Sequence, residues 1–279
     1  MMLLGARAPF DFGASLRFLT CFPPAAGEQE ITGTTLVKAY RVGGHTVRAR
    51  LSPAGTGLRC ELESPEPLTD DVVTAAADRI RFHLSLDDDL TGFYDSADEG
   101  FRPVVERLRG YHQVKFPSPV ENLVWAILCQ RTPMRAAARA KAAIVAHAGN
   151  PYGAFPDVGQ LLETPADLIG GLIGDPRKAG RLRGALEEWA GVDEAFLRHG
   201  PYEEVRAFLL GLPGIGPWSA SFILIRGLGR MEEAPIDREL TRSAAAAYGR
   251  TLGERELREL AAGYGPWQGY WAHYLRVAG

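Results

Sequence analysis

The stretch that decides the fold is Leu212-Pro213-Gly214-Ile215-Gly216-Pro217-Trp218-Ser219-Ala220, which lies between two helical patterns. Its two glycines flank the apolar Ile215, and glycine permits a positive φ and a close backbone approach. The helix that starts at Pro217 presents unpaired N–H groups and the positive end of its dipole. Together these groups can hold a phosphate without a lysine, with Ile215 packed between the helices. An ordinary connection between two helices is the alternative.

A second motif follows 18 to 20 residues after Pro217, where Pro235-Ile236-Asp237 precedes a helical pattern over residues 238–248. Aspartate is a preferred residue at the position before a helix, because its carboxylate accepts hydrogen bonds from the free backbone N–H groups. Asp237 is therefore expected to cap this helix.

The chain has helical spacing from about residue 103 onward. Ser118-Pro119-Val120-Glu121 is typical of a capping box with proline at the first helical position, and Thr164-Pro165-Ala166-Asp167 indicates a second cap. The spacing predicts helices over residues 120–129, 132–147, 177–189, 203–210, 217–228, 238–248, 254–262 and 266–277.

The first 65 residues have mainly strand patterns. Partial alternation predicts strands over residues 36–42, 46–51 and 58–62, separated by the turn residues Gly43-Gly44 and Ser52-Pro53-Ala54-Gly55. Residues 70–84 return to helical spacing. We therefore predict an α+β fold: an N-terminal antiparallel sheet domain with a packed helix over residues 1–102, and an all-helical region over residues 103–279.

The composition excludes several classes of protein. Of the 279 residues, 46% are hydrophobic and 23% charged, which argues against disorder. No apolar run approaches the roughly 18 residues of a membrane span, and residues 1–10 lack a convincing signal peptide. The three scattered cysteines, Cys21, Cys60 and Cys129, exclude a disulfide framework or a zinc knuckle. They fit a reducing cytoplasm, so a cytoplasmic location is expected.

The net charge of −3 taken alone argues against a nucleic-acid partner. The charge is unevenly distributed: residues 1–100 carry 9 Lys and Arg against 15 Asp and Glu, and residues 101–279 carry 22 against 19. Only four of the basic residues are lysine. Arginine binds phosphate well, although a GC-rich coding sequence explains the same bias more simply.

The hairpin segment and Asp237 resemble the helix–hairpin–helix motif and the following catalytic aspartate of DNA repair glycosylases. Pro9-Phe10-Asp11-Phe12 with Leu16-Arg17-Phe18-Leu19, the helix ending Ala126-Ile127-Leu128-Cys129-Gln130, and Pro266-Trp267-Gln268-Gly269-Tyr270 resemble the AlkA-type 3-methyladenine DNA glycosylase II branch. The resemblance spans nearly the whole chain. It implies a helix–hairpin–helix body of two helical lobes with the active-site cleft between them.

The resemblance implies that Asp237 is the catalytic residue, a role compatible with capping the helix. Its carboxylate would stabilise an oxocarbenium-like sugar and orient the attacking water. An N3- or N7-alkylated purine is already cationic and departs without a general acid. The lyase members of the superfamily use a lysine where this chain has Trp218, so we expect a monofunctional hydrolase. The iron–sulfur branch is excluded because the three cysteines are scattered.

The target base must leave the duplex to reach Asp237, and an aromatic pocket would favour a cationic base. By resemblance, the base-binding candidates are Trp218, Trp267, Phe18, Phe222 and Gln130; for each aromatic residue, core packing is the alternative. Because stacking would dominate, we expect a broad specificity. The expected DNA contacts are Gly214, Ile215, Gly216, Ser219 and Arg131.

Arg131 marks a departure from the family pattern. After Gln130 the AlkA-type members tend to carry an apolar wedge that fills the space left by the flipped base, whereas this chain has Arg131-Thr132-Pro133. An arginine could fill the gap and bond the orphan base, or it could be a solvent-exposed residue at a helix junction. Arg177-Lys178-Ala179-Gly180-Arg181 resembles a basic family segment and could equally be a solvated face.

The resemblance also bears on cofactors and partners. The family hairpin often holds a monovalent cation through backbone carbonyls near Gly214 and Gly216; no other cofactor is expected. The expected partner is double-stranded DNA with damaged bases, with no membrane contact and a monomeric state. The leading hypothesis is a base-excision repair glycosylase for alkylated bases of the 3-methyladenine and 7-methylguanine type. The alternatives are a glycosylase for oxidised or deaminated purines and a non-catalytic DNA-binding module, which would need no carboxylate at Asp237.

Overall fold

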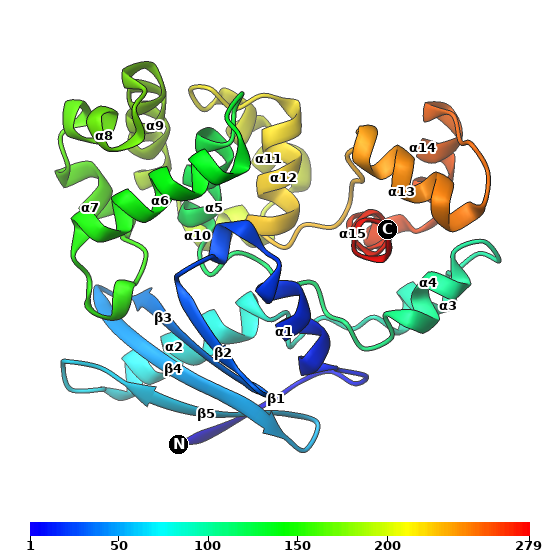
Figure 1. The fold of residues 1–279 in the computed structure, drawn as a ribbon, viewed down its shortest axis with the longest axis horizontal. Helices are drawn as coiled ribbons and strands as arrows, with labels where there is room; N and C mark the ends of the chain where they lie inside the picture. The colour runs from blue at the N-terminus through cyan, green and yellow to red at the C-terminus, as the bar shows by residue number, and fades with distance from the viewer.

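The computed structural model describes residues 1–279, and it places a sheet below two groups of helices (Figure 1). The sheet is fully antiparallel with strand order β1-β5-β4-β3-β2. Its strands are β1 (Met2–Gly5), β2 (Gln29–Thr32), β3 (Thr35–Val42), β4 (His45–Ala54) and β5 (Gly57–Glu63). The three central strands confirm the alternation-based prediction, while the short edge strands β1 and β2 have too little alternation to be predicted.

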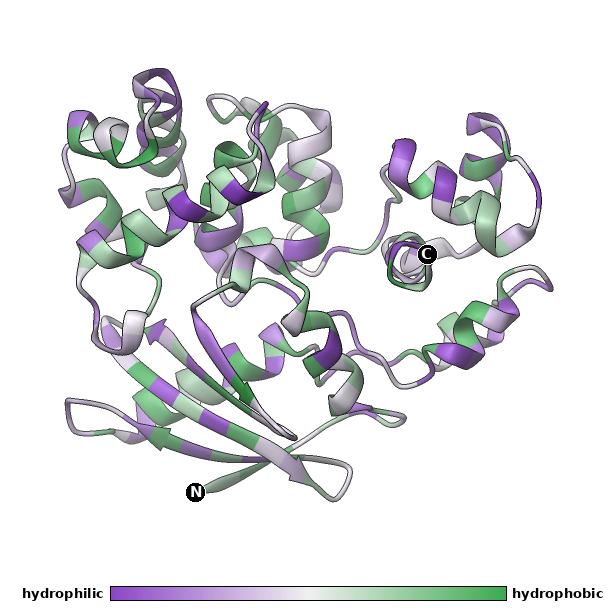
Figure 2. Cartoon of the chain, viewed as in Figure 1, coloured by the Kyte–Doolittle hydropathy of each residue, from purple (hydrophilic) through white to green (hydrophobic).

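One face of the sheet packs on the core, as the alternating hydropathy of its strands indicates (Figure 2). In register, Leu36 of β3 pairs with Leu51 of β4, and Leu51 pairs with Cys60 of β5; all three are fully buried. Helix α2 (Asp70–His83) contacts β3 and is capped by the Thr69 hydroxyl, which accepts from Val72 N–H at 3.4 Å.

Helix α1 (Phe12–Thr20) was not predicted, although strands form most of the regular structure in the first 65 residues, as expected. Its buried Phe12, Leu16 and Leu19 recur at helical spacing and enter the core. The short helices α3 (Thr91–Asp95) and α4 (Arg102–Arg107) were also not predicted, because five or six residues carry too little periodicity.

The helical part agrees with the predicted pattern and adds shorter helices to it. Its helices are α5 (Pro119–Leu128), α6 (Met134–Ala148), α7 (Val158–Glu163), α8 (Ala166–Ile173), α9 (Pro176–Ala190), α10 (Glu194–His199), α11 (Tyr202–Gly211), α12 (Pro217–Gly227), α13 (Arg238–Tyr248), α14 (Glu254–Gly263) and α15 (Gln268–Ala278), with single 3-10 turns η1 (Pro23–Ala25), η2 (Pro151–Gly153) and η3 (Gly265–Trp267). None of these helices has the length and apolar character needed to cross a bilayer.

Two expected caps differ in detail. Ser118 does cap α5, since its hydroxyl accepts from Glu121 N–H at 3.1 Å. The Glu121 side chain, however, does not return the bond; it is buried and pairs with Lys141 at 2.7 Å. Thr164 caps no helix, because its hydroxyl donates to the carbonyl of Gln160 at 3.0 Å.

The apolar core groups the chain differently from its sequence order. One cluster of 37 buried residues joins the sheet, α1 and the segment around residues 84–114 with α13–α15. A second cluster of 27 buried residues holds α5–α12 together. The chain therefore crosses from the first group to the second after residue 114 and returns before α13. The domain division at residue 102 stays a prediction.

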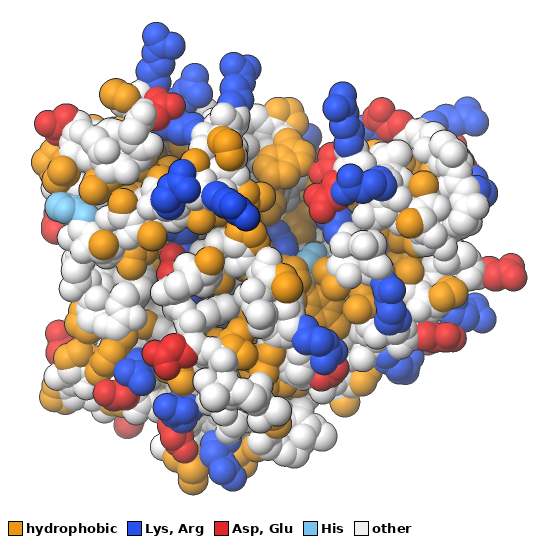
Figure 3. All heavy atoms as spheres, in the orientation of Figure 1, with side chains coloured by type: hydrophobic (Ala, Val, Ile, Leu, Met, Phe, Trp, Pro, Cys, Tyr) orange, Lys and Arg blue, Asp and Glu red, His pale blue; other side chains and the backbone are white.

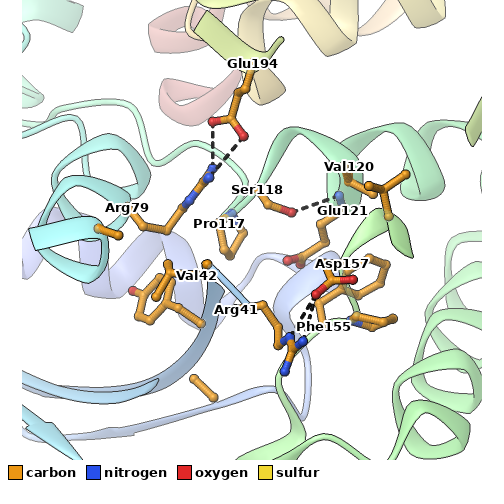
Figure 4. A pocket seen from close by; sticks show the side chains of 16 residues that line it. Arg41, Val42, Arg79, Pro117, Ser118, Val120, Glu121, Phe155, Asp157 and Glu194 are labelled. Atoms are coloured by element: carbon orange, nitrogen blue, oxygen red, sulfur yellow. Dashed lines mark hydrogen bonds and ion pairs between the residues drawn. The ribbon is translucent and has the colours of Figure 1, made fainter. Parts of the chain in front are cut away.

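Ion pairs join the sheet group to the second helical group along a seam. Figure 4 shows Arg41 of β3 directed at Asp157 and Arg79 of α2 directed at Glu194, and these pairs measure 2.8 and 3.0 Å. The cavity between them has a volume of about 270 Å³. Because the charged groups around it already have partners, the structure gives this cavity no free group for a ligand, and we regard it as a packing seam.

Candidate active site

A second cavity, of about 230 Å³, lies between the two groups of helices. Its walls come from η1, α5, the start of α6, α12, the residues before and at the start of α13, and α15. Figure 3 shows the hollow on this face, with apolar, basic and histidine atoms inside it. Drug-sized ligands usually occupy cavities of roughly 300 Å³ or more, so this one suits a single aromatic ring system.

Asp237 lies in the lining of this cavity and caps α13, as the sequence predicts. Its Oδ1 accepts from Leu240 N–H at 2.8 Å. Its Oδ2 accepts from Arg276 Nη2 at 3.0 Å and from the indole Nε1–H of Trp218 at 3.4 Å. Three donors from three helices therefore fix the carboxylate in one orientation while leaving it a quarter exposed.

These contacts keep Asp237 ionised. Partial burial raises the pKa of its carboxyl, but the Leu240 N–H bond, the charge and hydrogen bond of Arg276 and the Trp218 bond lower it by more, so the net pKa lies below the ordinary value of an aspartate. The site thus presents a fixed negative charge at neutral pH.

The aromatic wall of the cavity is a stacked pair. The rings of Trp218 and Phe222 lie 5.3 Å apart at an interplanar angle of 8°, one helical turn apart on α12. Trp218 is 50% exposed, an unusual state for tryptophan. Across the cavity lie His273 and Arg276 of α15. Burial, together with the nearby Arg226 and Arg276, holds the pKa of His273 well below its ordinary value, so its ring is neutral.

The hairpin between α11 and α12 joins the cavity rim. Only Gly214 adopts a positive φ, of +80°, while Gly216 has an ordinary φ of −101°. Ile215 is buried between the helices, as predicted, and Ser219 is buried in the first turn of α12. Gln130, at the end of α5, donates from Nε2 to the carbonyl of Gly214 at 2.6 Å, so its visible contact is with the hairpin.

Of the predicted site residues, only Asp237, Trp218 and Phe222 line the cavity. The hairpin residues and Gln130 lie at its rim, and Phe18, Trp267 and Arg131 also lie outside the lining. The ring of Phe18 packs against Tyr111 and against the guanidinium of Arg226, 5.0 Å from its centroid. Trp267 packs on Gly92, where an added Cβ would lie 2.4 Å from the indole. Both aromatic rings thus take the core-packing alternative. Arg131 is exposed beside the hairpin with φ +50°, at the junction before α6.

Several lining residues were not singled out from the sequence, among them Arg226, Arg276, His273 and Met134. Met134 is 52% exposed at the start of α6. Arg226 had a usable signal, because it is an isolated charge in the apolar run of α12. Arg276, His273 and Met134 had no such signal in the sequence, because only folding brings α15 and α6 to this cavity.

The cavity lining has no cluster of metal-ligating side chains and no lysine that could act as an amine nucleophile. Nowhere in the chain do three or more His, Cys, Asp or Glu side chains form a group that could hold a metal ion. The carbonyls expected to hold a monovalent cation each accept one hydrogen bond, from Gln130 for Gly214 and from Ala220 N–H for Gly216. Each carbonyl retains a second lone pair, so the cation stays a prediction.

Known proteins resemble this chain along its full length. No family profile matches it. A probable bifunctional transcriptional activator/DNA repair enzyme AlkA of Mycobacterium tuberculosis is 29% identical over 279 residues, covering 98% of this chain and 55% of the relative. The chain therefore spans about half the length of that relative. A DNA-3-methyladenine glycosylase of Bacillus subtilis is 25% identical over 208 residues, covering 69% of this chain and 68% of its own.

Solved structures share the fold. The 3-methyladenine DNA glycosylase of Archaeoglobus fulgidus superposes with a TM-score of 0.82 at 20% identity, covering 99% of this chain and 97% of its own. An 8-oxoguanine glycosylase/lyase of Clostridium acetobutylicum, solved with double-stranded DNA, has a TM-score of 0.69 at 14% identity and covers 96% of this chain and 90% of its own. With the hairpin and the capping Asp237 in the cavity, these likenesses lead to one conclusion: the chain is similar in sequence to proteins named AlkA and DNA-3-methyladenine glycosylase, and it has the fold of solved DNA glycosylases.

Proposed function

We propose that this protein is a monofunctional DNA glycosylase that hydrolyses the N-glycosidic bond of alkylated bases in duplex DNA, as a step of base excision repair. The observation that carries the proposal is the Asp237 carboxylate, ionised and fixed by Leu240, Arg276 and Trp218 in a cavity sized for one base. The printed names of the Bacillus and Archaeoglobus proteins support 3-methyladenine as a substrate type.

The chemistry follows from the position of the negative charge. Departure of the base leaves an oxocarbenium-like sugar, and a fixed carboxylate stabilises that charge without reorganising. Because Asp237 Oδ2 is already bonded to Arg276 and Trp218, the carboxylate acts by electrostatic stabilisation and by orienting water. Alkylation at N3 or N7 makes the purine a cation, so no general acid is required.

The base reaches Asp237 by leaving the duplex. The exposed face of Trp218, stacked on Phe222, offers a flat surface for the base. The hairpin around Gly214 and the N-terminus of α12 are proposed to hold the backbone phosphates, with Arg131 beside them. The DNA-bound Clostridium neighbour supports double-stranded DNA as the partner.

Hydrolysis without strand cleavage is proposed because no lysine lines the cavity. Trp218 occupies the position in the second hairpin helix where the lyase members carry their nucleophile. Borohydride treatment of the protein on abasic duplex DNA should therefore trap no covalent complex, and a robust adduct would contradict the monofunctional proposal.

The deciding experiment measures release of methylated purines from alkylated duplex DNA by the unmodified protein and by Asp237→Asn. Asparagine keeps the size and the capping ability of aspartate but removes the charge, so release should fall at least about a hundredfold. DNA affinity should be retained.

Asp193→Asn is the matched control. Asp193 caps α10 by accepting from Ala195 N–H at 2.9 Å and lies outside the cavity. It should leave release unchanged. Equal release by the Asp237→Asn variant and the unmodified protein would rule out the assigned mechanism. DNA binding without release by the unmodified protein would favour the binding module or another lesion.

A further inference from the structure

Arg226 lines the cavity, and its guanidinium has no hydrogen-bond partner. The side chain projects from α12, and the residue is 8% exposed. Its Nε and Nη2 are enclosed and unpaired. The rings of Phe22 and Phe18, with centroids at 4.8 and 5.0 Å, hold the planar group in place.

Such an arrangement is costly for the folded protein. Burial lowers the pKa of Arg226 to about 10, so it remains charged at neutral pH. An enclosed cation that lacks a carboxylate or a carbonyl partner destabilises the fold. A charge retained at a cost, in the lining of a cavity, is a candidate for binding a ligand.

Gln113 lines the same cavity and is also unpaired. It is fully buried, and neither its Nε2 nor its Oε1 has a hydrogen-bond partner. An amide supplies one acceptor and one donor group, whereas a guanidinium supplies donors only. The lining thus offers a donor at Arg226 and an amide of either polarity at Gln113.

We infer that Arg226 and Gln113 read the edge of the flipped base and select purines that carry a carbonyl at C6 and a proton on N1. Arg226 would donate to the C6 oxygen, and the Gln113 carbonyl would accept from N1–H. A 6-amino purine places donors against the donors of Arg226 and leaves them unpaired. The inference deepens the proposed function and rests on it: among alkylated purines, guanine-type lesions are favoured over adenine-type lesions.

Neither charge nor stacking produces this preference. In DNA, 7-methylguanine and 3-methyladenine are both cationic, so repulsion by Arg226 acts on both and cancels in their ratio. Trp218 and Phe222 present a flat aromatic surface that accepts either ring system. The group at C6 is therefore the difference that Arg226 and Gln113 can detect.

The test uses one DNA substrate treated with a methylating agent, which contains both lesions. Initial release rates of 7-methylguanine and 3-methyladenine, each divided by its spontaneous rate, give an internal ratio. Arg226→Met keeps the length and the apolar contacts of the side chain but removes the donors. It should lower the 7-methylguanine to 3-methyladenine ratio by about tenfold. Arg226→Lys keeps a donor without the planar fork, so its 7-methylguanine to 3-methyladenine ratio should lie between those of the unmodified protein and Arg226→Met.

Arg198→Met is the matched control, because Arg198 also lies over an aromatic ring, 3.6 Å from the centroid of Phe82, and is outside the cavity. It should leave the ratio unchanged. An unchanged ratio in Arg226→Met, or an equal change in Arg198→Met, would overturn the inference.

A binding measurement separates this inference from the proposed function. Duplexes carry 2′-fluoro-deoxyinosine or 2′-fluoro-deoxyadenosine opposite an abasic site; the fluorine keeps the glycosidic bond intact. The unmodified protein should bind the inosine duplex about tenfold more tightly, and Arg226→Met should lose that preference. Equal affinity of the unmodified protein for both duplexes would overturn the inference. Absence of methylated-base release would contradict the proposed function. The binding measurement would still show whether Arg226 distinguishes a 6-carbonyl purine from a 6-amino purine.

Discussion

At the scale of single residues, the contact between Arg276 and Asp237 sets the charge of the site. Arg276 also donates to the carbonyl of Pro235 at 3.0 Å, so the same guanidinium holds the loop and the carboxylate. An arginine in this place makes the aspartate a weaker base and a more permanent anion.

This arrangement predicts the pH dependence of catalysis. Under the proposed function the ionised Asp237 is the active form, so the rate should be full above its pKa and fall as the pH drops through it. Because the Leu240 N–H bond and Arg276 hold that pKa below the ordinary value of an aspartate, single-turnover release should begin to fall only at a lower pH than an unpaired aspartate would allow, after subtraction of the rate without enzyme. Arg276→Met removes a lowering contribution and should move the acidic limb to higher pH. If the acidic limb of the pH–rate profile does not move in Arg276→Met, Asp237 is not the group that titrates there.

The sequence predicted the residues of this site unevenly. Asp237, Trp218 and Phe222 meet in the cavity because the hairpin fixes their separation along α12 and the following loop. Phe18 and Trp267 were misplaced as cavity residues, because a motif gives the position of a side chain in its helix but not the direction in which tertiary packing turns it. Arg276 was missed because its partner lies 39 residues away along the chain.

At the scale of elements, the two glycines of the hairpin have different physical roles. Gly214 has φ +80°, and an added Cβ would lie 3.0 Å from Arg181 Cδ. Gly216 has φ −101°, and its added Cβ would meet nothing within 4 Å. The first is required by the conformation of the turn, and the second leaves the backbone open to an approaching phosphate.

Paired substitutions should separate these roles. Gly214→Ala should lower the free energy of unfolding by about 1–2 kcal/mol, because it strains a left-handed residue. Gly216→Ala should leave stability nearly unchanged and still weaken binding to undamaged duplex DNA, because its methyl group would keep the phosphate away. Urea titration and DNA-binding titration of both variants check this. Equal losses of stability would contradict it.

The larger elements were predictable where their patterns were long. In helices such as α9 and α13 the helical spacing of apolar residues continues over several turns, and in the three central strands the alternation continues over several residues. Each pattern therefore indicates one kind of structure. Helix α1 was not predicted, because its nine residues provide only two helical repeats. The Thr164 cap was wrong because Pro165 takes the N-cap position of α8, which leaves Thr164 outside that helix.

At the scale of the whole molecule, a buried ion cluster ties η1 to the second helical group. Lys141 of α6 donates to the carbonyl of Pro24 at 2.8 Å, to Glu121 at 2.7 Å and to Glu28 at 2.5 Å. All three charged side chains are nearly inaccessible to solvent. Because Pro24 lines the active-site cavity, this cluster also holds one of its walls.

Removal of the Lys141 charge should strongly destabilise the fold. Lys141→Met leaves Glu28 and Glu121 buried without their main partner, so unfolding free energy should fall by about 3–5 kcal/mol in a denaturant titration. Arg41→Met is the control: it breaks the partly exposed Asp157 pair at the seam and should cost less than about 1 kcal/mol. Similar losses in the two variants would show that the buried cluster does not hold the molecule together.

The shared core of the sheet group and α13–α15 has a consequence for how the protein is made. During synthesis the sheet leaves the ribosome long before Trp271, Tyr274 and Leu275, which are fully buried in the same cluster. The second helical group, α5–α12, emerges in between and can complete its own core first. The sheet and α1 therefore cannot complete their core until α13–α15 have been synthesised. A pause or a stop codon before α15 would leave apolar surface of the sheet group exposed, and only a chaperone could cover it.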